Sequence, residues 1–252
     1  NEGIEFSHAK ALCFDYEGPM YEYRSNRIAQ ISTPDHKMYF KRRRWESWSV
    51  GTVEEMSTCR ACIPFTGYRM VKGRPDNDAL RVLVMTQADG HYAEDGSVCY
   101  NFTKQRKIER CKTLLRRAGL VYTLSVYDQA DRKYHRFRIV NRDVPLWLRQ
   151  FRSKTFGTWL FDESADIFFD ELPHWDGYRP APNSIQYATC NKVNADLVQA
   201  FAHLSGRVAS LKLKKVNEAR EHWLPSYTVS VWLTPGNCHE IRNKPQVSSF
   251  KG

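Results

Sequence analysis

The sequence contains no apolar run close to the roughly eighteen residues that a membrane-spanning helix needs. Its first residues also lack the apolar centre of a signal peptide, so we expect a soluble, cytosolic protein with no membrane segment. The seven cysteines are odd in number and scattered, which suits free thiols better than a disulfide framework. Cys59 and Cys62 have zinc-ligand spacing, but no second Cys or His pair lies near them in the sequence, so zinc is the weaker alternative.

Acidic side chains are too few to balance the basic ones. The chain has 38 Lys and Arg residues against 28 Asp and Glu, which gives a net charge of +10 and a pI near 9.3. Such a balance favours a polyanionic partner, either nucleic acid or an anionic membrane surface. The length of 252 residues, with 42% hydrophobic residues, leaves room for a real core and for two structural units.

One pattern occurs twice in the chain. Leu80 to Tyr92 is an apolar helical run that stops at Asp89-Gly90, and a second apolar run stops in the same way at Asp176-Gly177. When the chain is shifted until these aspartates coincide, the later apolar positions also coincide, and Gly119 falls on Gly206. An aspartate before a helix-ending glycine is by itself as often structural as functional. Its repetition indicates one supersecondary unit used twice.

Each copy is expected to run helix, two strands, helix, two strands. In the first copy, the segments after the opening helix are His91–Glu94, Ser97–Thr103, Lys104–Ala118, Leu120–Asp128, Lys133–Asn141 and a short helix at Pro145–Phe151. In the second copy the opening helix is Trp159–Trp175, and the later segments are Ser184–Cys190, Asn191–Ser205, Arg207–Lys215 and Tyr227–Thr234. Residues 235–252 have little periodicity and are expected to be irregular.

Residues 1–74 differ from the rest of the sequence because they show no long helical periodicity, many aromatic residues and several turn signals. This pattern indicates strands and loops. Ile28–Ile31 and Lys37–Phe40 alternate like strands on either side of Thr33-Pro34-Asp35-His36. The basic run Lys41-Arg42-Arg43-Arg44, with Trp45 and Trp48 after it, is either a phosphate-binding patch or a solvated face.

The duplicated order and the string Ala88-Asp89-Gly90-His91-Tyr92 resemble the LAGLIDADG homing endonucleases. Val82–Gly90 would be the first motif and Phe169–Gly177 the second. The string Thr33-Pro34-Asp35-His36 resembles the Thr-x-x-His block of inteins. These resemblances imply an α+β protein with a partial intein-like (Hint) β-rich region at 1–74 and a LAGLIDADG endonuclease domain at 75–252. The domain would consist of pseudo-symmetric α-β-β-α-β-β-α repeats, at about 75–155 and about 156–252, that form a DNA-binding saddle.

The resemblance also implies a metal centre. Asp89 and Asp176 would meet at the pseudo-twofold axis and hold Mg²⁺, a hard cation that prefers oxygen ligands. Lys154 would lie near the active-site water. The plain alternatives are helix-capping aspartates that face solvent and an ordinary surface lysine.

Thr33 and His36 would be the remnant of a splicing block. The chain begins with Asn1 rather than Cys or Ser and ends at Gly252 without a terminal Asn, so we expect that it does not splice itself.

The outward faces of the strands are expected to contact DNA, with Arg and Gln reading base edges and Lys binding phosphates. These positions are Ser97, Asn101, Thr103, Arg136, Arg138, Ser184, Gln186, Lys212 and Lys214. A merely solvated strand face is the alternative for each of them.

Glu171, Pro173 and Trp175 stand where the family prefers small or aliphatic residues at its helix crossing, so the second centre is expected to differ from the first. The function implied is that of a monomeric, site-specific double-stranded DNA endonuclease, working in the cytoplasm or where its target DNA lies. The alternative is a non-catalytic nucleic-acid-binding protein or an RNA maturase on the same scaffold.

Overall fold

The computed structural model describes residues 10, 13, 15–42, 47–69, 77–151, 155–214, 224–236, 238–241 and 245–251. The chain divides into two compact units. The first unit contains Asn1–Met70, Ala202–Lys212 and Val231–Gly252, and the second contains Val71–Phe201 and Leu213–Ser230. In the part of the chain that is described, no helix is both long and apolar enough to cross a membrane.

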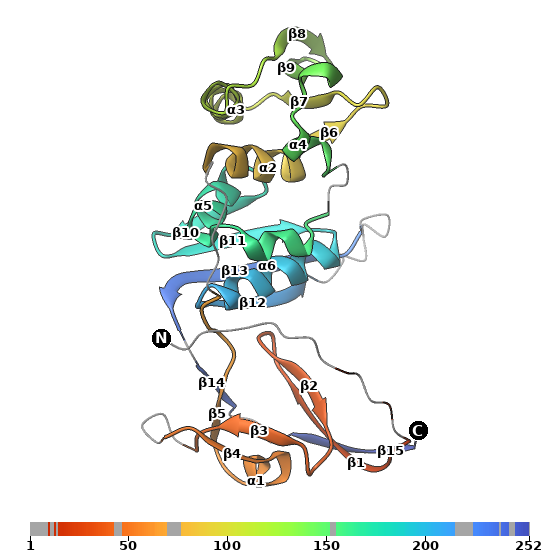
Figure 1. Cartoon of the computed structure of the whole chain (residues 1–252), viewed down its shortest axis with the longest axis vertical. Helices are drawn as coiled ribbons and strands as arrows, with labels where there is room; N and C mark the ends of the chain where they lie inside the picture. The colour runs from red at the N-terminus through yellow and green to blue at the C-terminus, as the bar shows by residue number, and fades with distance from the viewer. Residues whose placement is uncertain are drawn as a thin grey trace. The chain divides into compact units, whose positions relative to one another are not determined.

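The first repeat begins with a helix and two strands and then repeats that order. Its elements are α2 (Asn77–Asp89), β6 (Gly90–Tyr92), β7 (Val98–Phe102), α3 (Gln105–Arg117), β8 (Thr123–Gln129), β9 (Arg132–Ile139), the 3₁₀ helix η1 (Asn141–Asp143) and α4 (Leu146–Arg149). The strands form an antiparallel sheet in the order β6-β7-β9-β8 (Figure 1). The expected segments are therefore confirmed, with boundaries that move by a few residues.

The second repeat has the same order of elements. They are the 3₁₀ helix η2 (Thr158–Asp162), α5 (Ala165–Glu171), the 3₁₀ helix η3 (Leu172–His174), β10 (Gly177–Ala181), β11 (Ser184–Thr189), α6 (Lys192–Leu204), β12 (Arg207–Lys214) and β13 (Ser226–Pro235). Its sheet order is β10-β11-β13-β12, which matches the first sheet strand for strand. The α+β class and the duplicated unit are thus confirmed.

The repeated glycines serve two different purposes. Gly119 and Gly206 follow α3 and α6 with φ of 65° and 74°, so they end those helices in the left-handed conformation that favours glycine. Gly90 and Gly177 instead start strands, and they are required by space. A Cβ on Gly90 would lie 2.8 Å from the Thr86 carbonyl oxygen, and one on Gly177 would lie 2.9 Å from the Gln186 carbonyl oxygen.

Helix α2 is the centre of the second unit. Eight consecutive or nearly consecutive positions are buried, namely Ala79, Leu80, Val82, Leu83, Val84, Met85, Thr86 and Gln87. A helix that is apolar on nearly every side must be covered on nearly every side, and α2 packs on α3, α5, β6 and β7. Its polar exceptions are partly satisfied: the Thr86 and Tyr100 hydroxyls share a hydrogen bond of 2.7 Å and Gln87 Nε2 donates to the Phe151 carbonyl at 3.2 Å, while Gln87 Oε1 is buried without a hydrogen-bond partner among the described residues.

Two expectations were wrong. Trp159–Trp175 is not one helix. Glu163 is extended, with φ of −102° and ψ of 167°, and separates η2 from α5. α5 then ends at Glu171 and η3 follows, because Pro173 cannot donate a backbone hydrogen bond and its ring opposes a continuing α-helix. Residues 235–252 are not all irregular, since they contain β14 (Cys238–Ile241) and β15 (Gln246–Lys251). These strands pair with exposed edges through main-chain bonds, which requires no side-chain periodicity. Among the described residues, they follow β13 in place of a closing helix.

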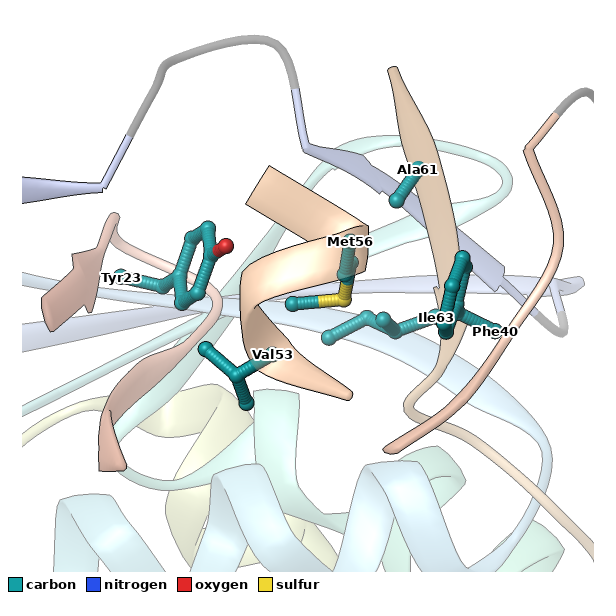
Figure 2. Close-up of a cluster of buried hydrophobic side chains, with 6 residues drawn as sticks. All are labelled: Tyr23, Phe40, Val53, Met56, Ala61 and Ile63. Carbon is teal, nitrogen blue, oxygen red and sulfur yellow. The ribbon is translucent and has the colours of Figure 1, made fainter. Parts of the chain in front are cut away.

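The first unit is rich in short strands, as residues 1–74 were expected to be. The strands and helix in that range are β1 (Glu17–Arg24), β2 (Ala29–Ser32), β3 (Lys37–Phe40), β4 (Ser49–Thr52), α1 (Val53–Ser57) and β5 (Ala61–Pro64). β1 lies between β15 and β2, β3 pairs with β4, and β5 pairs with β14. A small core forms around α1 from Tyr23, Phe40, Val53, Met56, Ala61 and Ile63 (Figure 2).

Candidate active site and nucleic-acid interface

Asp89 is the last residue of α2, and its carboxylate forms an ion pair with the Lys107 ammonium of α3. The two side chains are only 23% and 12% exposed, respectively, so this pair is partly withdrawn from solvent. The Lys107 ammonium also lies 5.9 Å from the centroid of the Trp175 ring. A single lysine therefore touches the end of the first motif and the residue before Asp176.

Asp176 is half-buried between η3 and β10, and its carbonyl accepts a hydrogen bond from the Ala188 amide at 3.3 Å. Trp175 is buried and packs on Phe102 with a centroid distance of 5.6 Å. Arg106, the neighbour of Lys107, donates to the His174 carbonyl at 2.6 Å. The first turn of α3 thus contacts the chain ends of both motifs.

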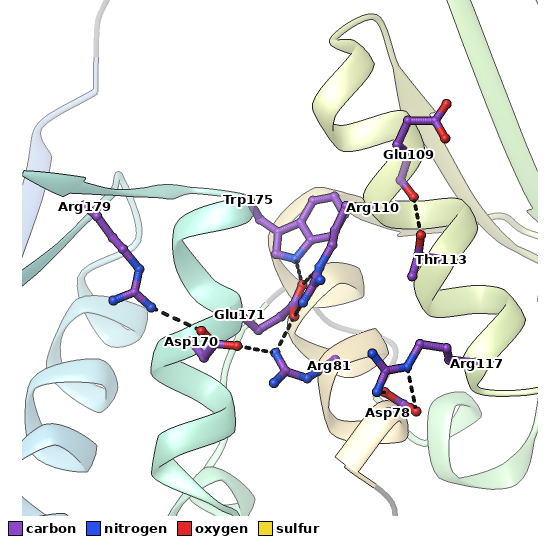
Figure 3. A network of polar contacts seen from close by, with 10 residues as sticks. All are labelled: Asp78, Arg81, Glu109, Arg110, Thr113, Arg117, Asp170, Glu171, Trp175 and Arg179. Carbon is purple, nitrogen blue, oxygen red and sulfur yellow. Dashed lines mark hydrogen bonds and ion pairs between the residues drawn. The ribbon is translucent and has the colours of Figure 1, made fainter. Parts of the chain in front are cut away.

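Glu171 has no exposed surface, yet it is ionisable and lies where α2 packs on α5. Its carboxylate accepts hydrogen bonds from Arg81 at 2.8 Å, from Arg110 Nε at 3.1 Å and from Trp175 Nε1 at 2.9 Å (Figure 3). A buried carboxylate is costly unless it is paired and hydrogen-bonded. The charge expected at the helix crossing therefore reaches basic partners rather than solvent.

Asp170 extends this network to the surface. Arg81 donates to its carboxylate at 2.8 Å, and Arg179 donates to it at 3.3 Å (Figure 3). Partial burial raises the pKa of Asp170, but the hydrogen bond and positive charge of Arg81 outweigh this effect and lower the pKa overall. At His174, burial is the main influence and lowers the pKa of the imidazole.

The outward face of the first sheet carries arginine and tyrosine side by side. Asn101 is opposite Arg136 in the register of β7 and β9, and Arg136 Nε donates to Asn101 Oδ1 at 2.9 Å. The Arg136 guanidinium lies 5.0 Å from the centroid of the Tyr127 ring, and Tyr127 stacks on Tyr134 with a centroid distance of 5.6 Å. Arg136 is exposed, so this face can present a guanidinium to a polyanion.

Arg138 lies two residues after Arg136 on the same face of β9 and forms an ion pair with Asp95. The Ser97 amide donates to Asp95 at 3.0 Å, and this hydrogen bond is the largest cause of the lowered pKa of Asp95; the Ser97 side chain and Arg138 lower it further. Ser97 itself is fully buried, so it supports Asp95 and Arg138 from below the surface. Thr103 is exposed just after β7.

On the second sheet, Ser184 and Gln186 are half-buried on β11, while Ile185 and Tyr187 alternate with them into the core. Tyr178 donates a hydrogen bond to Gln186 Oε1 across the strand pair. Lys212 and Lys214 are exposed near the end of β12. Lys154 lies outside the described residues, as do Arg43, Arg44 and Trp45.

Thr33 and His36 lie at the two ends of a turn between β2 and β3, where the His36 amide donates to the Thr33 carbonyl at 3.2 Å. The Thr33 hydroxyl is a partner of Asp35 and is the main cause of the lowered pKa of that carboxyl. The turn also caps α1, because its carbonyls accept the Val53 and Glu54 amides at 2.9 and 3.0 Å.

The chain resembles solved LAGLIDADG proteins. One is the homing endonuclease I-DmoI in its mesophilic variants, with 11% identity, coverage of 62% of this chain and 89% of that chain, and a TM-score of 0.42. A structure of I-DmoI in complex with DNA and Ca has 11% identity, coverage of 62% of this chain and 83% of that chain, and a TM-score of 0.42. The N-terminal LAGLIDADG domain of DUF199/WhiA has 11% identity, coverage of 64% of this chain and 78% of that chain, and a TM-score of 0.39. No family model and no curated protein matches the chain. At these values the function has to be argued from the residues of the chain itself.

Sequence reasoning missed Arg106, Lys107 and Arg110, which join α3 to the motif ends. A signal for them exists, since Lys107 lies beside the buried stripe Ile108, Cys111, Leu114 and Leu115 rather than on the far side of α3.

Among the described residues, no group of three or more His, Cys, Asp or Glu side chains could hold a metal ion. The candidate donors Asp89 and Asp176 offer only carboxylate oxygens, which fits a hard cation such as Mg²⁺ and does not favour zinc.

Proposed function

We propose that the chain is a site-specific double-stranded DNA endonuclease of the LAGLIDADG type that uses Mg²⁺. The observation that carries the proposal is the duplicated unit with matching sheet orders, in which each Asp is followed by a glycine packed against backbone. A scaffold that repeats its strands in this way offers two similar faces to the two halves of a duplex. The basic and aromatic outward face of the first sheet supports DNA as the ligand.

Asp89 and Asp176 would hold the metal, which needs few protein ligands because water and phosphate oxygens complete its shell. When bound, the cation supplies polarisation of the scissile phosphate and a lowered pKa of a bound water. Lys107 places a positive charge beside Asp89, where it can neutralise the carboxylate or meet a phosphate oxygen. Arg106 and Trp175 keep the first turn of α3 on the second motif, which orients Lys107.

The experiment that tests this function is metal-dependent cutting. Incubating the full chain with a plasmid library that carries randomised duplex inserts should yield linear products in Mg²⁺ and none in a chelator. Sequencing the new ends should reveal one preferred site. Asp89→Asn should abolish the products, while His36→Ala should leave them unchanged because His36 lies in a turn of the first unit.

The alternative is a non-catalytic nucleic-acid-binding protein, and the Lys107 ion pair that neutralises Asp89 favours it. Sequence-specific binding without cutting at any divalent metal concentration would establish this alternative.

We also propose, from the Thr33 and His36 pattern alone, that residues 1–74 derive from an intein splicing region. If His36→Ala stopped cutting as completely as Asp89→Asn does, with folding and binding preserved, that assignment would be wrong.

Binding to duplex DNA is expected to depend steeply on salt, because each contacted phosphate contributes about −0.9 to the slope of log affinity against log salt. Contact with about five phosphates gives a slope of about −4.5, which anisotropy titrations between low and moderate salt would measure. A slope equivalent to one or two phosphates would contradict the proposal that the two sheets form a DNA-binding saddle.

Arg136→Ala separates base reading from phosphate binding. It should relax sequence preference if Arg136 reads a base, and it should weaken all sequences equally if Arg136 meets phosphate. Arg142→Ala is the matched control, because it removes the same charge from a side chain that is 87% exposed on η1, outside the strands.

A further inference from the structure

The β3–β4 hairpin of the first unit has one face on the core and one face on solvent. Tyr39 is opposite Val50 in its register, and Lys37 is opposite Thr52. Phe40, which alternates with Tyr39, enters the core around α1 (Figure 2). Tyr39 is 50% exposed and Val50 is 65% exposed, so the outward face presents apolar and aromatic surface to solvent.

The aromatic side chains on this outward face are ordered against each other. Tyr39 and Trp48 stack with their ring centroids 5.2 Å apart and their planes 18° apart. The Lys41 ammonium lies 4.8 Å from the centroid of the Trp48 ring, in reach of a cation–π contact. Large rings usually contribute most when they are buried, so a half-exposed stack is a feature that core formation does not explain.

Positive charge accompanies these rings. Lys37 and Arg42 are exposed on the same hairpin, and the sequence continues with Arg43 and Arg44. In residues 37–52 the basic side chains are Lys37, Lys41, Arg42, Arg43 and Arg44, and the acidic side chain is Glu46. A polyanion is therefore the complementary partner, and exposed aromatic rings add affinity for polyanions whose units are flat.

We propose that this outward face, formed by Lys37, Tyr39, Lys41, Trp48 and Val50, binds single-stranded DNA. Unpaired bases would stack on Tyr39, whose ring is already fixed by Trp48, and the backbone phosphates would lie along Lys37 and Lys41. Stacking platforms beside basic side chains are the usual means of holding an unpaired strand, whereas a duplex keeps its bases out of reach. The choice of DNA over RNA rests on the proposed function, while the stacking geometry does not.

The test compares two labelled chains of equal length in anisotropy titrations with the full protein. One is a decamer of thymidylate, and the other is a decamer of abasic deoxyribose phosphate, which keeps the phosphates and lacks the bases. We expect the abasic chain to bind about tenfold more weakly. Tyr39→Ala should weaken thymidylate binding by about tenfold without affecting the abasic chain, and Tyr39→Phe should retain binding.

Tyr68→Ala is the matched control, since Tyr68 is 46% exposed and lies outside the β3–β4 hairpin. It should leave thymidylate binding unchanged, and thermal unfolding should confirm that each variant is folded. Lys37→Ala should weaken both decamers and reduce the salt slope by about one.

Equal affinity for the abasic and thymidylate decamers would overturn the proposal, because charge alone would then account for binding. Competition by anionic phospholipid vesicles but not by thymidylate would assign the face to a membrane and would overturn it as well. Tighter binding of a uridylate decamer would overturn the choice of DNA. Duplex cutting reports separately on the proposed function, so Asp89→Asn should lose cutting and keep thymidylate binding.

Discussion

Glu171→Ala is expected to lower the free energy of unfolding by about 3 to 5 kcal/mol. The substitution leaves Arg81 and Arg110 without their shared carboxylate, and their side chains are only 17% and 24% exposed. It also removes the acceptor of the Trp175 indole hydrogen bond, which is 2.9 Å long. Urea unfolding followed by circular dichroism should show a lower midpoint with an unchanged slope.

Asp170→Ala is the matched control for Glu171→Ala. Both carboxylates bind Arg81 at 2.8 Å, but the Asp170 side chain is 52% exposed. An exposed ion pair contributes less than about 1 kcal/mol, so this variant should unfold near the wild-type midpoint. A triple variant in which Arg81, Arg110 and Glu171 are all replaced by Met or Leu should recover much of the loss. Well-packed apolar side chains are often as stabilising as a buried network of paired charges. Equal effects of the two single substitutions would show that burial does not set the strength of the network.

Much of the duplicated unit could be predicted because burial leaves a periodic trace in the sequence. Helix α3 has its apolar stripe at Ile108, Cys111, Leu114 and Leu115, and β7 alternates Val98, Tyr100 and Phe102 into the core. The left-handed glycines Gly119 and Gly206 mark the ends of corresponding helices. These features are local, and local patterns are what a single sequence reports well.

The misses are the features that depend on distant partners. β15 is held by the edge of β1, from Glu17 opposite Lys251 to Glu22 opposite Gln246, and its own side chains carry little periodicity. Pro173 was visible in the sequence, but the apolar pattern around it outweighed the lost backbone donor in the prediction.

The candidate site was only partly accessible from the sequence. Asp89 and Asp176 stand out because their motif recurs, whereas Lys107 belongs to another element and reaches Asp89 only after α3 packs on α2. Ser97 was expected on an outward face from its alternation with Val98, but the side chains of Asp95 and Arg138 close over it. Alternation gives the face of a strand, and it does not give what covers that face.

The two proposed catalytic centres are expected to be unequal. Asp89 ends a continuous helix and follows Ala88, so its position is set by the well-packed α2. Asp176 follows the 3₁₀ helix η3, and the Trp175 backbone leaves the helical region with φ of −112° and ψ of −91°. Carboxylates that must hold a cation and a phosphate within a few tenths of an ångström lose rate when their support is irregular.

Asp89→Asn should therefore slow the first cut, measured as loss of supercoiled plasmid, by about a thousandfold, the loss of about 4 kcal/mol of transition-state stabilisation. Asp176→Asn should slow the first cut by at most about tenfold, because the faster centre served by Asp89 makes that cut. In a time course on supercoiled plasmid, the wild-type chain should accumulate a nicked intermediate before the linear product, and Asp176→Asn should prolong that intermediate.

Glu171→Gln is a further check on the second centre, since it keeps hydrogen-bonding atoms but removes the negative charge that Arg110 and Trp175 contact. It should slow the second cut more than the first. Linearisation without a nicked species, with Asp89→Asn and Asp176→Asn equally damaging, would show that the irregular end of the second motif has no mechanistic consequence.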